Sequence, residues 1–127
     1  MRYLFLILMF ISLSVFGAVS VNTTTSGGAG TAVHVINGTS ALGTGAITSG
    51  TCATVVTTSA TGTATTDVID WGFNGDPTGV TGYAASASGM LTIIAYPSAN
   101  NVNFKVCNNT AGSITPGAIT LNWKVAR

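Results

Sequence analysis

The sequence predicts an all-β domain, an antiparallel β-sandwich of six to seven short strands with an immunoglobulin-like or jelly-roll topology. Two observations support this. Short stretches rich in strand-forming residues are separated by clusters of turn residues, and no long stretch beyond the N-terminal leader has a helical period. The Gly, Ser and Ala runs have no fixed repeat, which disfavours a β-solenoid. A flattened barrel is the alternative.

Residues 1–20 are expected to be a secretory signal peptide. Met1-Arg2-Tyr3 gives a positive start, residues 4–16 are apolar, and small residues follow. The apolar run is short for a membrane span of roughly 20 residues, although an uncleaved anchor is the alternative. Cleavage is expected after Ser20, or else after Gly17. The chain is then expected to contact a membrane only through this export signal.

Residues 21–30 contain mainly Thr, Ser and Gly, with little to bury, and are expected to form a flexible tether. The remaining residues, 31–127, have the size of one sandwich domain. Its first strand is predicted over residues 31–36 and is ended by the turn dipeptide Asn37-Gly38. Residues 41–50 are predicted to be an edge strand or a loop.

The middle of the chain supplies three further strand predictions. Residues 52–60 are dense in Thr and Val, whose branched side chains favour strands. Residues 67–73 follow, with Ile69, Trp71 and Phe73 on one face. Turn residues and a long loop around Tyr83 lead to residues 90–96, which are apolar on both faces. That pattern is typical of a central strand, and Pro97 is expected to end it.

The C-terminal part alternates apolar and polar residues in two stretches, 102–106 and 118–125. The turn residues of 108–117 between them predict that the two stretches pair as a β-hairpin. Lys105 and Lys124 are expected to face water. The side chains expected in the core are Val102, Phe104, Val106, Ile119, Leu121, Trp123 and Val125.

Charged residues make up 6% of the chain, which excludes some partners. Beyond the leader, three basic and three acidic side chains cancel. They are Lys105, Lys124, Arg127, Asp67, Asp70 and Asp76. Nucleic acid binding needs clustered Lys and Arg and is not expected. A surface with so little charge associates readily, so self-association is a further prediction.

The two cysteines, Cys52 and Cys107, lie at predicted strand ends in a chain expected to be exported. An intramolecular disulfide is predicted, with free thiols or an intermolecular bond as alternatives. Closing so long a loop stabilises a fold by about 4 kcal/mol in the chain-entropy description. One histidine and two cysteines do not indicate a metal site.

No residue pattern predicts catalysis or a cofactor, so a non-enzymatic protein is expected. The single histidine, His34, lies in a predicted strand, and no Ser or Cys is marked as an activated nucleophile. Asp67 and Asp70 point to opposite faces of a strand, unlike a glycosidase pair. Asp70, Asn74 and Asp76 could surround a calcium ion, but turn-capping carboxylates are the preferred interpretation.

Tyr83 and Tyr96 are the candidate binding residues. Each borders a turn that contains Gly or Pro. A phenol ring there can lie at the surface and stack on a sugar. The two tyrosines therefore predict glycan contact.

Six short motifs stand in a fixed order along the chain: TC at 51–52, TDVIDWGFN at 66–74, GY at 82–83, AYP at 95–97, NVNFKVCN at 101–108 and TPGAITLNW at 115–123. Together they resemble a small β-rich domain at the C-terminal end of phage and environmental virion-associated proteins, also seen in uncharacterised exported bacterial proteins. The resemblance covers residues 51–125 and implies a structural or surface-binding role without catalytic residues. A signal peptide departs from a virion protein and favours an exported cellular relative.

These observations predict a secreted structural or adhesive module on a cell or virion surface, which contacts a surface glycan or protein. A carbohydrate-binding module that uses the two tyrosines is the alternative. A third hypothesis is a fibre subunit whose N-terminal strand completes the sheet of a neighbour.

Overall fold

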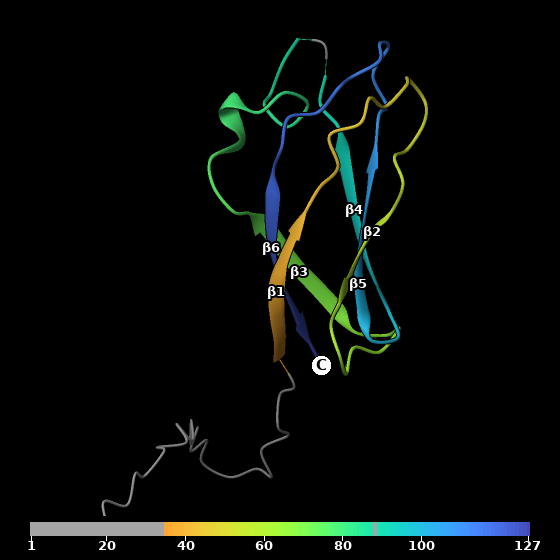
Figure 1. The fold of residues 1–127 in the computed structure, drawn as a ribbon, viewed down its shortest axis with the longest axis vertical. Coiled ribbons are helices and arrows are strands. Elements are labelled where there is room, and N and C mark those ends of the chain that lie inside the picture. The colour runs from red at the N-terminus through yellow and green to blue at the C-terminus, as the bar shows by residue number, and fades with distance from the viewer. Residues whose placement is uncertain (1–34, 88) are drawn as a thin grey trace, which may run out of the picture. The chain divides into compact units, whose positions relative to one another are not determined.

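The computed structural model describes residues 35–87 and 89–127. In this part of the chain six strands form two three-stranded antiparallel sheets (Figure 1). The predicted signal peptide, the predicted tether and His34 lie outside the described residues. The predicted all-β sandwich is confirmed.

The first sheet has the strand order β1-β6-β3 and the second has the order β2-β5-β4. Each sheet therefore has one central strand, β6 in the first and β5 in the second. The strands of the first sheet are β1 (Val35–Ala41), β6 (Thr120–Ala126) and β3 (Val68–Phe73). The strands of the second are β2 (Val56–Ser59), β5 (Asn101–Cys107) and β4 (Thr92–Ser98).

The core lies between the two central strands, because each presents alternate apolar side chains to the other sheet. Trp71 of β3 meets Phe104 of β5 edge to face, with ring centroids 6.3 Å apart, which joins the two sheets. Ile119, also expected in the core, is only partly buried and packs against it. The buried side chains of the two central strands are Val102, Phe104, Val106, Leu121, Trp123 and Val125.

The predicted C-terminal hairpin is wrong, although the predicted burial of its two strands is right. β5 pairs with β2 and β4, whereas β6 pairs with β1 and β3. The connection between them therefore crosses from one sheet to the other. Alternation fixes which face of a strand is buried but does not fix its partner. The turn residues between β5 and β6 form the connection between the two sheets and not a tight hairpin turn.

The first strand also differs from its prediction, because Asn37-Gly38 lies inside β1 and not in a turn. Gly38 pairs with Trp123, and a β-carbon at Gly38 would lie 2.5 Å from the indole ring. The indole N–H of Trp123 donates to the Ser40 hydroxyl at 2.9 Å. Ser40 in turn shares a hydrogen bond with Thr58 of β2, in the other sheet. Packing around Trp123 thus overrides the turn signal.

Strand β4 was predicted to be central and to end before Pro97, but it lies at an edge and contains Pro97. An edge strand tolerates proline because one side of its backbone needs no ladder partner. The β4–β5 reversal places Asn100 at a φ of 61°, a conformation that Asn adopts more readily than most residues.

The predictions for residues 41–50, 52–60 and 67–73 are confirmed in outline. Ile69, Trp71 and Phe73 of β3 share the inner face. Strand β2 is shorter than predicted, because residues 52–55 contribute only an isolated bridge at Cys52. Residues 41–50 are mainly loop, held by a bridge between Ile47 and Ile114.

Candidate functional site

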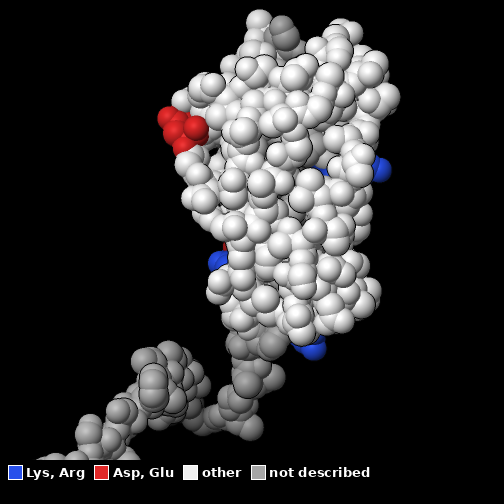
Figure 2. Space-filling model, in the orientation of Figure 1, with Lys and Arg blue, Asp and Glu red and all other residues white. Residues whose placement is uncertain are grey.

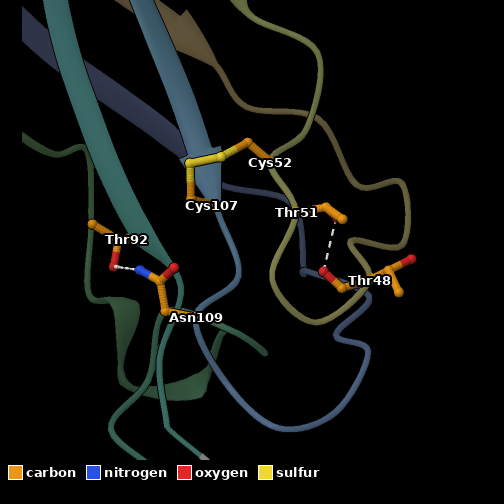
Figure 3. Close-up of a disulfide and its surroundings, with 6 residues drawn as sticks. All are labelled: Thr48, Thr51, Cys52, Thr92, Cys107 and Asn109. Carbon is orange, nitrogen blue, oxygen red and sulfur yellow. Dashed lines mark hydrogen bonds between the residues drawn. A yellow bond between two sulfur atoms is a disulfide. The ribbon is translucent and has the colours of Figure 1, made fainter.

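The predicted disulfide between Cys52 and Cys107 is confirmed. Figure 3 shows it where the loop before β2 meets the end of β5. Backbone hydrogen bonds flank it: the amide of Ala53 donates to the carbonyl of Val106 at 2.8 Å, and that of Asn108 donates to Thr51 at 2.9 Å. Cys107 is buried and Cys52 is exposed. The bond therefore fastens a surface loop to the central strand of the second sheet.

Asn108, directly after the disulfide, organises the loops at this end and was not singled out from the sequence. Its side chain is fully buried. The amide nitrogen donates to the carbonyls of Ile47 at 2.7 Å and Gly112 at 2.8 Å, and the amide oxygen accepts from the Thr110 backbone at 2.9 Å. All of its contacts are internal, so Asn108 has a structural role.

The three aspartates lie apart, each with its own partners. Asp67 is buried, and its carboxylate accepts from Nε of Arg127 at 2.8 Å and from Nη2 at 3.1 Å. This contact raises the pKa of the Arg127 guanidinium. Asp70 pairs with Lys124 at 2.9 Å on an exposed face. The Asp70–Lys124 pair joins the neighbouring strands β3 and β6, and the Asp67–Arg127 pair joins the residue before β3 to the residue after β6.

Asp76 caps the short 3-10 turn Pro77–Gly79, as expected of a turn aspartate. Its carboxylate accepts from the backbone N–H of Thr78 at 2.9 Å, and this hydrogen bond lowers the pKa of Asp76. No group of three His, Cys, Asp or Glu side chains suited to a metal ion occurs in residues 35–87 and 89–127. The capping interpretation is confirmed for Asp76.

Tyr83 does not lie at the surface, and the prediction that its ring is available to a glycan is wrong. The residue is 2% exposed, and its ring meets that of Phe73 at 6.0 Å between centroids. The loop turns inward because the amide of Leu91 donates to the carbonyl of Gly82, whose φ is 84°. Burial raises the pKa of the Tyr83 phenol. Tyr83 is a core residue.

Tyr96 is 40% exposed, on the outer surface of the second sheet, as predicted. The side chains next to it follow from the strand register, in which Tyr96 pairs with Asn103 and Asn103 with Thr57. Ile94, two residues earlier on β4, is 47% exposed and pairs with Lys105. We call this surface the Tyr96 face; its members are Thr57, Ile94, Tyr96, Ser98, Asn103 and Lys105.

Asn103 links the three strands beneath the Tyr96 face and is only 5% exposed. Its amide oxygen accepts from the Thr57 hydroxyl at 2.8 Å. Its amide nitrogen donates to the Ser98 hydroxyl at 2.9 Å and to the Tyr96 carbonyl at 3.3 Å. These bonds fix the positions of the hydroxyl groups that flank the exposed ring. The sequence signal for Asn103 was only a polar residue between buried neighbours.

Lys105 supplies the charge of the Tyr96 face. Lys124 and Arg127 are engaged in ion pairs, whereas Lys105 has no ion pair in the described part of the chain. None of the three aspartates is paired with a strand of the second sheet. Among the six members of the Tyr96 face, Lys105 alone is charged.

Three hollows lie elsewhere on the surface of the described residues. One of about 330 Å³ lies over the Asp70–Lys124 pair and Gly72, on the outer surface of the first sheet. Another, of about 380 Å³, lies beside Asp76 at the end of that sheet. The third, of about 350 Å³, lies beside Cys52, whose sulfur is bonded to Cys107.

Comparison with models of protein families, with curated proteins and with solved structures gave no match. The resemblance to a virion-associated domain therefore stays a prediction. Among the described residues no helix is long and apolar enough to span a membrane. The disulfide is typical of proteins from oxidising compartments.

Proposed function

We propose that the protein is an exported, non-enzymatic structural or adhesive module on the surface of a cell or virion. The observation that carries the proposal is the Cys52–Cys107 bond, whose exposed half lies in a surface loop. Thiols persist in reducing compartments and disulfides in oxidising ones, so this bond favours an extracellular location. The predicted leader of residues 1–20 supports the same location.

The character of the surface is the second support. Charged side chains are few and scattered on the face shown in Figure 2. Hydroxyl, amide and backbone groups must then supply most polar contacts. A surface with little net charge does not repel its neighbours, which suits a module that packs against other molecules. This is the chemistry of a contact surface, and we assign no reaction to it.

Antibody labelling of intact cells or virions of the source organism tests the proposal. The full chain is expected at the outer surface, with signal from intact particles equal to that from permeabilised ones. Cys52→Ser with Cys107→Ser should lower the surface signal, because a domain without its crosslink is cleared more readily. Signal that appears only after permeabilisation would contradict the proposal.

A glycan-binding function through Tyr96 is the second candidate. Its support is the exposed phenol ring beside hydroxyl groups that Asn103 holds in place. Tyr83 takes no part in this candidate, because it is buried. Loss of glycan binding in Tyr96→Ala, with unchanged binding in Tyr83→Phe, is the expected pattern.

A further inference from the structure

We propose that the Tyr96 face binds a polysaccharide that carries carboxylate groups, with Tyr96 as the stacking platform and Lys105 as the partner of the carboxylate. The inference rests on the second candidate function and names its ligand class. Three features of the face carry it: an exposed aromatic ring beside an apolar side chain, oriented hydroxyl groups, and one unpaired cation.

The apolar part of the face suits the flat side of a sugar ring. Tyr96 and Ile94 are 40% and 47% exposed and lie two residues apart on β4, so both point outward. At about 3.3 Å per residue their side chains are about 7 Å apart. That spacing forms one strip along the strand. A strip of this kind accommodates an extended chain better than a compact ligand.

The hydroxyl groups beside the ring offer a ligand one hydrogen-bond donor and one acceptor. Ser98 accepts from Asn103, so its own O–H is free to donate to a ligand oxygen. Thr57 donates to Asn103, so its lone pairs are free to accept from a sugar hydroxyl. Because Asn103 fixes both groups, a ligand orders few additional side chains on binding.

The single cation defines the charge of the ligand. Lys105 lies opposite Ile94 and diagonal to Tyr96, at about 7–8 Å from it. A carboxylate on a sugar next to the stacked one can therefore reach the ammonium group. Nucleic acids and densely sulfated chains require clustered cations. One isolated lysine can pair with one carboxylate at a time, so the ring stacking on Tyr96 must supply most of the contact with a ligand such as a uronate chain.

Titration of the full chain, with its disulfide intact, with a tetramer of α-1,4-linked galacturonate tests the proposal. The fully methyl-esterified tetramer is the matched neutral probe. Amide chemical shifts of β4 and β5 are expected to change with the acid. Tyr96→Ala should weaken binding of both probes by at least about tenfold, as for a central aromatic contact.

Lys105→Met keeps the apolar stem and removes the charge. It should weaken binding of the acid by about two- to fivefold, the size of an exposed ion pair, and leave the ester unaffected. Lys124→Met is the control, because Lys124 lies in the other sheet and already pairs with Asp70. It should bind both probes as the unchanged protein does.

The proposal is overturned if neither probe shifts the β4 and β5 amides, or if Tyr96→Ala and Lys105→Met bind the acid normally. Concentration-dependent broadening of the same amides without any probe would instead identify a second copy of the chain as the occupant, which also overturns it. The surface-module function is separable. If the titrations fail but the Tyr96→Ala protein is still found on the surface of intact particles, the glycan assignment is wrong and the surface-module function stands.

Discussion

Tyr83 carries a hydroxyl into the core, where no hydrogen-bond partner for it occurs among the described residues. A buried polar group without a partner costs about 1–3 kcal/mol, so removing the oxygen while keeping the ring should do no harm. Tyr83→Phe is expected to raise the free energy of unfolding or leave it unchanged. Tyr83→Ala should lower it by about 3–5 kcal/mol, because the ring leaves a cavity. Urea melts of both variants provide the measurement.

The same phenol predicts how stability depends on alkaline pH. Burial raises the pKa of Tyr83 above its ordinary value near 10. Above that pH the unfolded chain releases the proton while the folded protein retains it, so the free energy of unfolding falls as pH rises. Below about pH 9 Tyr83 should contribute no slope. Melts between about pH 8 and 11 should show this fall in the unchanged protein, and a weaker one in Tyr83→Phe. Equal slopes would contradict the burial.

Gly38 and Gly72 form a matched pair on the two strands that flank β6. A β-carbon at Gly38 meets the Trp123 ring, whereas one at Gly72 meets nothing within 4 Å. Gly38→Ala is therefore expected to cost about 1–3 kcal/mol through overpacking. Gly72→Ala should be neutral or stabilise by up to about 1 kcal/mol, because alanine restricts the unfolded chain. Equal denaturation midpoints for the two variants would place Trp123 elsewhere.

At the scale of elements, the disulfide fastens the loop before β2 to the second sheet. The disulfide and its flanking hydrogen bonds hold this loop against β5. Replacing both Cys52 and Cys107 by Ser should lower the free energy of unfolding by about 2–5 kcal/mol. Thermal melts with and without reductant provide the measurement. Reductant should lower the melting temperature of the protein with both cysteines and leave that of the double variant unaltered.

The elements also show how far sequence patterns reach. Alternation in residues 102–106 and 118–125 identified the buried faces of β5 and β6, because burial depends on each strand alone. It paired them wrongly, since pairing depends on distant strands that compete for the same edges. Asn37-Gly38 signalled a turn from local preference, but the indole of Trp123 needs a residue without a side chain there.

Of the two tyrosines predicted to form the candidate site, one is at the surface and one is buried. Tyr83 and Tyr96 have similar neighbours in sequence, and both were expected at the surface. Strand alternation places Tyr96 outside, opposite the partly buried face of β4 that packs on the core. The position of Tyr83 depends instead on the path of a loop, which a hydrogen bond from Leu91 to Gly82 closes over the core. Such a contact between distant backbone groups leaves no local signal.

For the whole molecule, the central claim is that an exported chain folds into a disulfide-closed surface domain. The most direct measurement is the intact mass of the protein recovered from its native source without reductant, after treatment with an alkylating reagent. We expect the mass of residues 21–127 less two hydrogens, with no alkyl group added, because the leader is removed and Cys52 is bonded to Cys107. A mass that includes residues 1–20 and two alkyl groups would contradict the account.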